Sequence, residues 1–378
     1  MNTMSGIYIH IPFCHKACHY CDFHFSTQLG YIDRMIASIT KELTIRKDEL
    51  NQVVETIYFG GGTPSLLNSD QLSGLMAHLY SNFELSPETE VTLEANPEDL
   101  TLEKAREFAS LGINRLSVGI QTFDNDQLKF LNRAHNSRQA LESIENARAA
   151  GIENITLDLI FALPGHGTTK FEKDVKTALK LEVPHMSIYG LTIEEGTAFG
   201  NWVRRGKLKE ETEMENTKQY KLAERLLMAR GYEHYEVSNY CLPGYQSRHN
   251  TSYWLQKAYL GLGPGAHSYD GSHRIINQPN NHVYMKALEQ DGSYQEVEKL
   301  RPIDQINEYI LTRLRTVFGA DLDFLKGEYG ADLFAEKREF LEQLQEKGLA
   351  SLNQGVLSLS RHGFLIADEI SLELFYEK

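Results

Sequence analysis

Cysteine is scarce in this sequence, whose 378 residues contain only four. Four cysteines cannot supply the disulfide framework of a small secreted protein, so we expect reduced thiols and a cytoplasmic location. Long apolar runs are also missing, because nowhere do about 18 apolar residues follow one another without a charge, as a membrane-spanning helix requires. The first residues carry neither a basic nor an apolar stretch. This predicts no secretory leader and at most peripheral contact with a membrane.

Basic residues are in the minority. Lysine and arginine together number 38 against 52 aspartates and glutamates, which gives a net charge of −14. Proteins that bind nucleic acid need clustered positive charge to replace the phosphate counterions, so this balance excludes a broad nucleic-acid footprint. The hydrophobic content of 41% with 10 prolines is that of a folded chain rather than a disordered one. At about 150 residues per domain, the length predicts two or three domains.

The first half of the chain alternates short apolar runs with amphipathic stretches, the pattern of βα units around a parallel sheet. Helical periodicity fills the segments between the apolar runs, and Gly112 and Gly151 stand where helices are expected to end. Six such units predict an α/β fold with a partial TIM-like (βα)6 barrel over residues 1–195, whose chemistry lies at the carboxyl ends of the strands. The predicted strands are 6–11, 56–59, 90–95, 115–119, 155–161 and 185–191.

Two further segments follow the predicted barrel. Residues 196–300 are rich in tyrosine, glycine, asparagine and histidine with weak periodicity, which predicts an irregular extension able to cover the barrel mouth. Residues 301–378 show helical patterns and then a hairpin around residues 353–355, which predicts a small winged-helix-like α+β domain. Winged helices often bind DNA, but 9 basic against 14 acidic residues in this segment favour a packing role and no nucleic acid.

Three of the four cysteines fall within eight positions, directly after the first predicted strand. Cys14, Cys18 and Cys21 therefore share one loop at the predicted mouth of the barrel. Three thiolates can bind three irons of a cubane, or zinc if a neighbouring histidine adds a fourth ligand. Haem attachment through CxxCH is excluded, because Asp22 follows Cys21. The remaining alternative is that the three cysteines are buried and inert, but a loop rich in histidine disfavours it. The distant Cys241 is interpreted as a small apolar residue.

The spacing CxxxCxxC, with an aromatic residue before its last cysteine, resembles that of the radical S-adenosylmethionine superfamily. The resemblance implies a [4Fe-4S] cluster held by Cys14, Cys18 and Cys21, with S-adenosylmethionine on the open iron. A glycine-rich string at 59–65 ends the second predicted strand, where glycine lets the backbone approach a ligand. It is not a phosphate loop, because no GKS or GKT follows.

Further strings along the chain resemble the coproporphyrinogen dehydrogenase group, the HemN and HemW proteins. These strings are 8–14, 60–65, 94–97, 115–121, 158–165 and 261–266. In that group, the residues at matching positions bind S-adenosylmethionine, which implies this role for Tyr8, Gly61, Gly62, Thr63, Glu94, Gln121, Arg133 and Asp158. The polar members suit the ligand, since a carboxylate can chelate a ribose diol and an arginine can pair with a carboxylate. Glu94 and Asp158 also lie in apolar strand runs, where an unpaired charge is costly.

Two features distinguish the branches of this group. The proteins that oxidise coproporphyrinogen have a further cysteine two positions after the third, where this chain has Phe23. Residues 248–254 match the HNxxYW motif of the HemW branch, whose members are regarded as haem-binding chaperones. The match implies haem contact by His249, Tyr253 and Trp254, because imidazole can ligate haem iron and aromatic faces suit a porphyrin. The alternative for His249 is a structural role, as a partly buried histidine whose ring nitrogens are hydrogen-bonded within the protein.

Two functions therefore stay open from the sequence. The first is a haem chaperone that binds a [4Fe-4S] cluster, S-adenosylmethionine and haem, with haem-accepting proteins and an electron donor as partners. The second is an oxygen-independent coproporphyrinogen III dehydrogenase, which decarboxylates propionate groups through a 5′-deoxyadenosyl radical. Phe23 and the HNxxYW motif favour the first, and a structural zinc protein is a distant third.

Overall fold

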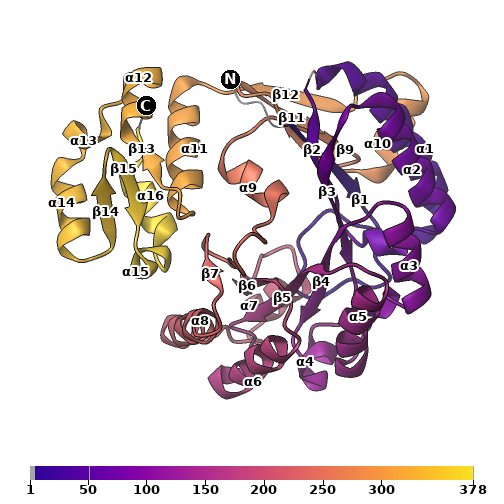
Figure 1. The fold of residues 1–378 in the computed structure, drawn as a ribbon, viewed down its shortest axis with the longest axis horizontal. Helices are drawn as coiled ribbons and strands as arrows, with labels where there is room; N and C mark the ends of the chain where they lie inside the picture. The colour runs from indigo at the N-terminus through magenta and orange to yellow at the C-terminus, as the bar shows by residue number, and fades with distance from the viewer. Residues whose placement is uncertain (1–4, 51, 378) are drawn as a thin grey trace.

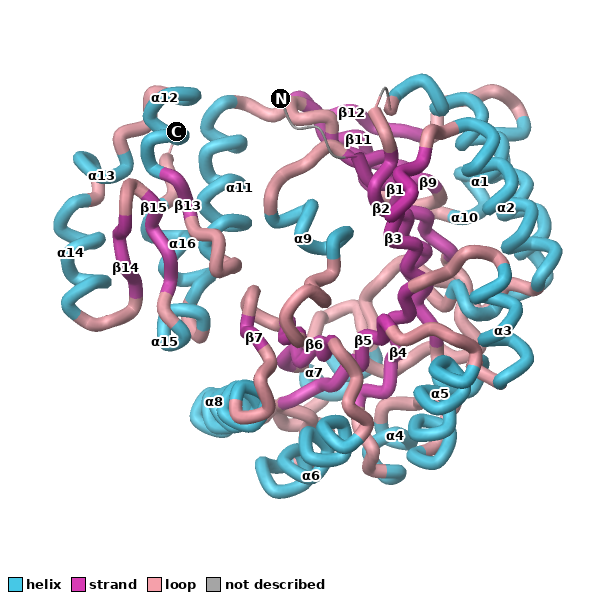
Figure 2. The backbone as a smooth tube through the Cα atoms, viewed as in Figure 1, coloured by secondary structure: helices cyan, strands magenta, loops and turns pink. Residues whose placement is uncertain are grey.

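A single curved sheet of twelve strands forms the centre of the computed structural model, which describes residues 5–50 and 52–377. Its strand order is β12-β11-β10-β9-β1-β2-β3-β4-β5-β6-β8-β7. Figure 1 shows helices in an arc around the outside of this sheet, and Figure 2 separates strands from helices by colour. Residues 1–4, part of the segment in which the sequence predicts no leader, lie outside the described residues.

The six predicted strands are present, and each pairs in parallel with the next along the chain. They are β1 (Ser5–Ile11), β2 (Val54–Gly61), β3 (Leu85–Ala95), β4 (Arg115–Gln121), β5 (Asn154–Phe161) and β6 (His185–Gly190). The helices between them are α1 (Ile32–Arg46), α2 (Ser69–Asn82), α3 (Leu102–Ser110), α4 (Asn125–Phe130), α5 (Ser137–Ala149) and α6 (Gly167–Lys180). Short 3-10 turns flank them at η1 (Leu29–Tyr31), η2 (Lys47–Glu49), η3 (Pro64–Leu66) and η4 (Pro97–Asp99). The partial (βα)6 barrel is confirmed.

Alternation along the strands separates an apolar outer face from a polar inner one, because successive side chains of a strand point to opposite faces. The outward residues of β1 to β6 are at most 3% exposed and pack in one hydrophobic core: Ile7, Ile9, Ile57, Phe59, Val91, Leu93, Leu116, Val118, Leu157, Leu159, Met186 and Ile188. The intervening positions carry polar or small residues, and the register places Tyr8 beside Tyr58 and His10 beside Gly60. The barrel therefore surrounds an interior suited to a polar ligand.

The segment 196–300 is more regular than its composition predicts. It contains α7 (Ala198–Arg204), α8 (Glu213–Met228), α9 (Arg248–Trp254) and α10 (Asn281–Glu289). Its strands are β7 (Glu233–His234), β8 (Asn239–Cys241), β9 (Tyr259–Leu262), β10 (His267–Tyr269), β11 (His273–Asn277) and β12 (Gln295–Lys299). β9 extends the sheet in parallel beyond β1, and β8 extends it antiparallel beyond β6. Strands of two to five residues are too short to show a period in the sequence, which is why composition alone suggested irregular structure.

The chain ends in a smaller unit with its own hydrophobic core. It consists of α11 (Pro302–Leu314), β13 (Ala320–Asp321), α12 (Leu322–Tyr329), α13 (Leu333–Glu336), α14 (Arg338–Glu346), β14 (Ala350–Asn353), β15 (Val356–Leu359), α15 (Arg361–Phe364) and α16 (Ala367–Leu374). The predicted hairpin is β14–β15, and the short β13, which has no signal in the sequence, adds a third antiparallel strand. Among the described residues, no helix is both long and apolar enough to cross a membrane.

A buried carboxylate ties the β9–α10 part of the extension to the barrel. Glu42 of α1 is fully buried and receives hydrogen bonds from Arg46 Nη1 at 3.1 Å and from the Gly263 backbone N–H at 2.8 Å. The Asn277 amide donates to it at 2.8 Å and the Tyr284 hydroxyl at 2.5 Å. Four donors converge on one carboxylate, three of them from the extension, so the packing of the extension depends on it.

Replacing Glu42 with alanine leaves the guanidinium of Arg46, 2% exposed, without its buried partner. We expect the free energy of unfolding to fall by about 3–5 kcal/mol, measured by chemical denaturation followed by circular dichroism. The matched control is Glu49→Ala, since Glu49 also binds Arg46 but is 44% exposed. Its expected loss is about 1 kcal/mol or less. Equal losses in the two variants would contradict this role for Glu42.

Candidate functional site

The cysteine loop begins at the carboxyl end of β1 and is fastened to the protein on both sides. The Cys14 N–H donates to the Ser26 carbonyl at 3.1 Å, and the Ser26 N–H donates to the Pro12 carbonyl at 2.9 Å. Farther along, the His19 N–H donates to the Leu131 carbonyl at 3.1 Å. All three cysteines of the loop are free and partly exposed. The loop thus presents its thiols at the end of the barrel where chemistry is expected.

Two of these sulfur atoms receive hydrogen bonds from neighbouring polar side chains. The Thr63 hydroxyl donates to Cys14 Sγ, and Arg133 Nη1 donates to Cys18 Sγ, each at 3.4 Å. Burial raises the pKa of the Cys14 thiol to about 11 and that of Cys21 to about 12. Such thiols deprotonate when they bind a metal, and donors aimed at the sulfur stabilise the resulting thiolates.

This donor set fits an iron–sulfur cluster. The sulfur ligands lie in one loop, and both a neutral and a cationic donor are aimed at them. In the described part of the chain, no three histidine, cysteine, aspartate or glutamate side chains are placed to hold one metal ion. In a cubane, by contrast, each thiolate binds a different iron. Cys241 lies apart: it is buried in β8 and pairs with His185 at the amino end of β6, whereas the cysteine loop follows the carboxyl end of β1.

The glycine turn after β2 fits against the start of the cysteine loop with no space for a side chain. The Gly62 N–H donates to the Ile11 carbonyl at 3.0 Å. A Cβ atom on Gly62 would lie 2.6 Å from the Phe13 carbonyl oxygen and 2.8 Å from that of Ile11. At Gly61, φ is +104° and a Cβ would meet the His10 ring at 2.4 Å. Only glycine allows these approaches.

Two partly buried carboxylates, Glu94 and Asp158, face the interior from β3 and β5. Glu94 accepts hydrogen bonds from the Tyr58 hydroxyl at 2.8 Å and from the Gly61 N–H at 3.1 Å. Asp158 is approached by the Ser117 hydroxyl at 3.4 Å. Burial raises the pKa of both groups, and the nearby Glu94 adds to the effect on Asp158, whose pKa rises to about 8. Such shifts in an interior site mark a candidate binding site.

A second set of contacts connects Arg133 to the end of β4. Its Nη2 donates to Asn96 Oδ1 at 2.5 Å and to the Gly119 carbonyl at 2.7 Å. The Asn96 amide in turn donates to the Thr63 hydroxyl at 3.1 Å, so Arg133 and Thr63 are joined through one side chain. Gln121 has the unusual φ of +70° for a residue other than glycine. Its Oε1 accepts a hydrogen bond from the Tyr189 hydroxyl at 3.2 Å.

The contacts link most of the residues predicted to hold the cofactors into one continuous region. Four residues in it have no predicted role: Tyr58, Asn96, Ser117 and Tyr189. Asn96 stands within a string that resembles the family. Tyr58 and Tyr189 point into the barrel from their strands, but the sequence does not locate the strand ends exactly enough to tell inward from outward side chains. Their contacts come from the packing of distant strands.

The HNxxYW segment forms α9, on the inner side of the sheet (Figure 1). His249 is almost fully buried and stacks on Tyr58 with ring centroids 5.0 Å apart. Its Nδ1 is hydrogen-bonded to the Thr56 hydroxyl and its Nε2 to the Tyr253 hydroxyl, both at 2.8 Å. Burial lowers the pKa of His249 to about 3, so the ring is neutral. In this arrangement, neither nitrogen of His249 faces open space.

The side chains of Tyr253 and Trp254, the other two predicted haem contacts, point in different directions. Tyr253 packs edge-on against Tyr259 and lines a cavity beside β1. Trp254 instead points to the C-terminal unit, where the guanidinium of Arg315 lies 5.5 Å from its ring centroid. Haem contact by His249, Tyr253 and Trp254 stays a prediction, and these positions do not place the three side chains around one space.

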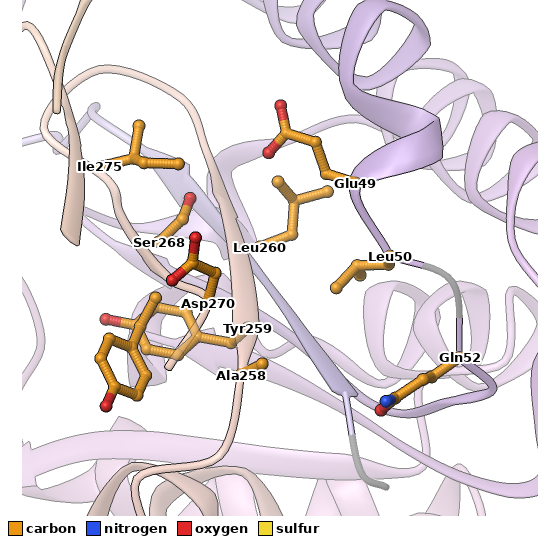
Figure 3. A pocket seen from close by; sticks show the side chains of 10 residues that line it. Glu49, Leu50, Gln52, Ala258, Tyr259, Leu260, Ser268, Asp270 and Ile275 are labelled. Atoms are coloured by element: carbon orange, nitrogen blue, oxygen red, sulfur yellow. The ribbon is translucent and has the colours of Figure 1, made fainter. Parts of the chain in front are cut away.

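Two cavities lie near β9. The larger, of ≈ 380 Å³, is bounded by Glu49, Leu50 and the strands β9 and β10 (Figure 3). Within the described residues, its lining includes none of the predicted site residues. The smaller, of ≈ 240 Å³, is lined by Tyr8 and Tyr253 and adjoins the cysteine loop at Phe23. Tyr259 lines both. The larger volume of a cavity therefore does not identify the functional site. The smaller cavity is the one that contacts predicted site residues.

Comparison with known proteins agrees with this geometry. A family model for the Radical SAM superfamily matches residues 8–178, and one for the HemN C-terminal domain matches residues 300–366. The chain is 35% identical to the heme chaperone HemW of Bacillus subtilis, over 97% of this chain and 98% of that protein. It is 36% identical to the heme chaperone HemW of Lactococcus lactis, over 97% and 96% of the two chains.

A solved structure shares the fold over almost the whole chain. The coproporphyrinogen III oxidase HemN of Escherichia coli, described as a Radical SAM enzyme, superposes with a TM-score of 0.85. The alignment covers 98% of this chain and 90% of that one, at 22% sequence identity. At that identity, the likeness concerns the fold.

The close approach at Gly62 leads to a prediction. In Gly62→Ala, the new methyl group meets backbone atoms that cannot move aside as a side chain does. We expect the free energy of unfolding to fall by about 1–3 kcal/mol in chemical denaturation. Gly74→Ala is the control, because a Cβ at that position in α2 meets nothing within 4 Å. There, alanine is expected to stabilise the helix by up to about 1 kcal/mol. Unchanged stability in Gly62→Ala would contradict the packing described.

Proposed function

Because the chain belongs to the HemW family of radical S-adenosylmethionine proteins, we propose that it is a haem chaperone, which binds haem and transfers it to acceptor proteins. Its proposed cofactors are a [4Fe-4S] cluster and S-adenosylmethionine. Haem-accepting proteins and an electron donor for the cluster are the proposed partners. The free cysteines suit the cytoplasm, which is the proposed location.

The observation that carries the proposal is the convergence of Thr63 and Arg133 on the sulfurs of the cysteine loop. In the proposed site, Cys14, Cys18 and Cys21 hold the cluster. Tyr8, Gly61, Gly62, Thr63, Glu94, Gln121, Arg133 and Asp158 are the proposed contacts of S-adenosylmethionine. When bound, the cluster supplies an electron to S-adenosylmethionine. The protein's own contribution is to hold sulfur ligands, exclude side chains at Gly62 and present two carboxylates from the barrel wall.

Charge supports the binding of a cofactor between the carboxylates. In the described part of the chain, no lysine or arginine forms a salt bridge with Glu94 or Asp158, although both are partly buried and burial raises the pKa of each. Buried carboxylates that lack a cation are costly unless hydrogen-bonded. The amino group and ribose hydroxyls of S-adenosylmethionine are donors that can satisfy them.

The chaperone is favoured over coproporphyrinogen oxidation by Phe23. At the position where the oxidising proteins have a further cysteine, this chain presents an aromatic side chain that is 69% exposed. Phe23 also lines the smaller cavity, together with Tyr253 of the HNxxYW segment. We assign the cofactors to residues 1–195, a share of the haem contacts to residues 196–300, and a packing role to residues 301–378.

The cluster assignment is tested by anaerobic reconstitution with iron and sulfide. A variant with Cys14, Cys18 and Cys21 all replaced by serine is expected to lose bound iron and sulfide and the brown absorption of the cluster. Cys241→Ala is the matched control and is expected to keep them, because Cys241 pairs with the first residue of β6, away from the loop that follows the carboxyl end of β1. Unchanged iron and sulfide content in the triple variant would refute the assignment.

Parallel assays separate the two functions. The reconstituted protein is titrated with haem, and a second sample is incubated with S-adenosylmethionine, a reductant and coproporphyrinogen III. We expect saturable haem binding and no protoporphyrinogen, measured by absorption and by chromatography of the porphyrins. Failure to bind haem would refute the chaperone, and turnover of coproporphyrinogen would establish the alternative.

A further inference from the structure

The smaller cavity brings together aromatic rings and imidazoles from distant parts of the chain. Its ≈ 240 Å³ are lined by three tyrosines and three histidines: Tyr8, Tyr253, Tyr259, His10, His24 and His267. Aromatic walls with few polar groups are typical of a site for a flat apolar ligand. The cavity is smaller than a porphyrin, so only one edge of such a ligand would fit inside it and the rest would extend over the rim. Phe23 stands at that rim, 69% exposed.

The histidines around the cavity differ in whether their nitrogens are free. His10 has both nitrogens engaged, Nδ1 with the Tyr8 hydroxyl at 3.1 Å and Nε2 with the His24 carbonyl at 2.8 Å. His249, directly behind Tyr253, also has both engaged. The His24 Nε2 is bound to Asn281 Oδ1 at 2.7 Å. A histidine ligates a metal through a nitrogen lone pair, so engaged nitrogens must break a hydrogen bond first.

Within the described residues, His267 differs from His10, His24 and His249 because both of its nitrogens, and not just one, are free. Neither of its nitrogens has a hydrogen-bond partner in the described part of the chain, and its side chain is exposed on β10. Partial burial, with Arg274 nearby, lowers the pKa of His267, so the neutral form that binds metals prevails near neutrality.

The backbone at His267 is held firmly. The neighbouring Ser268 is buried, and its hydroxyl accepts a hydrogen bond from the Gly261 N–H at 2.9 Å and one from Arg46 at 3.0 Å. His267 itself pairs with Ile276 of β11. A free imidazole is thus presented from a rigid strand into an aromatic cavity, as an axial ligand of haem requires.

We propose that His267 supplies an axial nitrogen to the iron of the haem cargo, with the porphyrin held against Tyr253 and Tyr259 and partly covered by Phe23. This inference rests on the proposed chaperone function and makes it specific. It assigns the ligand to the strand that follows the HNxxYW helix rather than to His249. In this arrangement, His249 is a positioning residue, because it fixes the Tyr253 hydroxyl through a hydrogen bond.

The test titrates hemin into the cluster-loaded full chain, with the spectrum before addition subtracted. The wild type is expected to give the absorption and electron paramagnetic resonance signature of histidine-ligated ferric haem. His267→Gly is expected to lose that signature, and free imidazole is expected to restore it by occupying the vacated position. Because His267 is exposed, circular dichroism is expected to show an unchanged fold. His282→Ala is the matched control, since His282 is an exposed histidine outside the cavity lining.

The outcomes distinguish the haem-chaperone function from the assignment of His267 as the ligand. If the wild type binds no hemin, the proposed function fails, and this inference fails with it. If the wild type binds hemin and His267→Gly keeps the same signature, the chaperone stands and the ligand assignment is overturned. Loss of the signature in His24→Ala or His282→Ala, with His267→Gly unaffected, also overturns it.

Discussion

The close approach of the glycine turn to the end of β1 is the contact on which the rest of the site depends. Strands β1 and β2 end side by side in parallel register, Ile11 opposite Gly61. Directly afterwards, Gly62 packs on the backbone of Ile11 and Phe13 with no space for a methyl group. This brings Thr63 to the first cysteine of the loop. Through Asn96, the same contact is connected to Arg133 at the second cysteine. One steric constraint therefore aligns sulfurs and donors that come from the segments following four different strands, β1 to β4.

The interior of this barrel is lined by polar side chains that suit a ligand, and it therefore lacks the stabilisation that apolar packing would give. Most small parallel barrels fill their interior with branched apolar side chains. Here the apolar residues face the helices, and the inner wall carries Tyr8, Tyr58, Glu94 and Asp158. The raised pKa of both carboxyl groups expresses the cost of burying them. That cost is tolerated because the outer face forms a continuous core. Residues that oppose the stability of a fold in this way mark its functional region.

The sequence was most informative where an element is long or a motif is local. The six strands have runs of apolar residues on one face, and the cysteine loop is specified by eight consecutive positions, so both could be predicted. The strands β7 to β12 have two to five residues, which is too short for a period, and their place in the sheet follows from pairing with β1 and β6. The sequence also could not show whether the nitrogens of His249 are available to a ligand. Whether its nitrogens are free depends on Thr56, which lies 193 positions away.

Helix α9 contacts both the proposed S-adenosylmethionine site and the aromatic cavity. The backbone N–H of His249 donates to Glu90 at 3.1 Å, which fastens the start of the helix to β3. The His249 ring then stacks on Tyr58, whose hydroxyl binds Glu94 in the proposed S-adenosylmethionine site. On the other side, the same ring holds Tyr253 at the wall of the aromatic cavity. A shift of α9 would therefore change the cofactor carboxylate and the cavity wall together, because both contacts pass through the buried ring of His249.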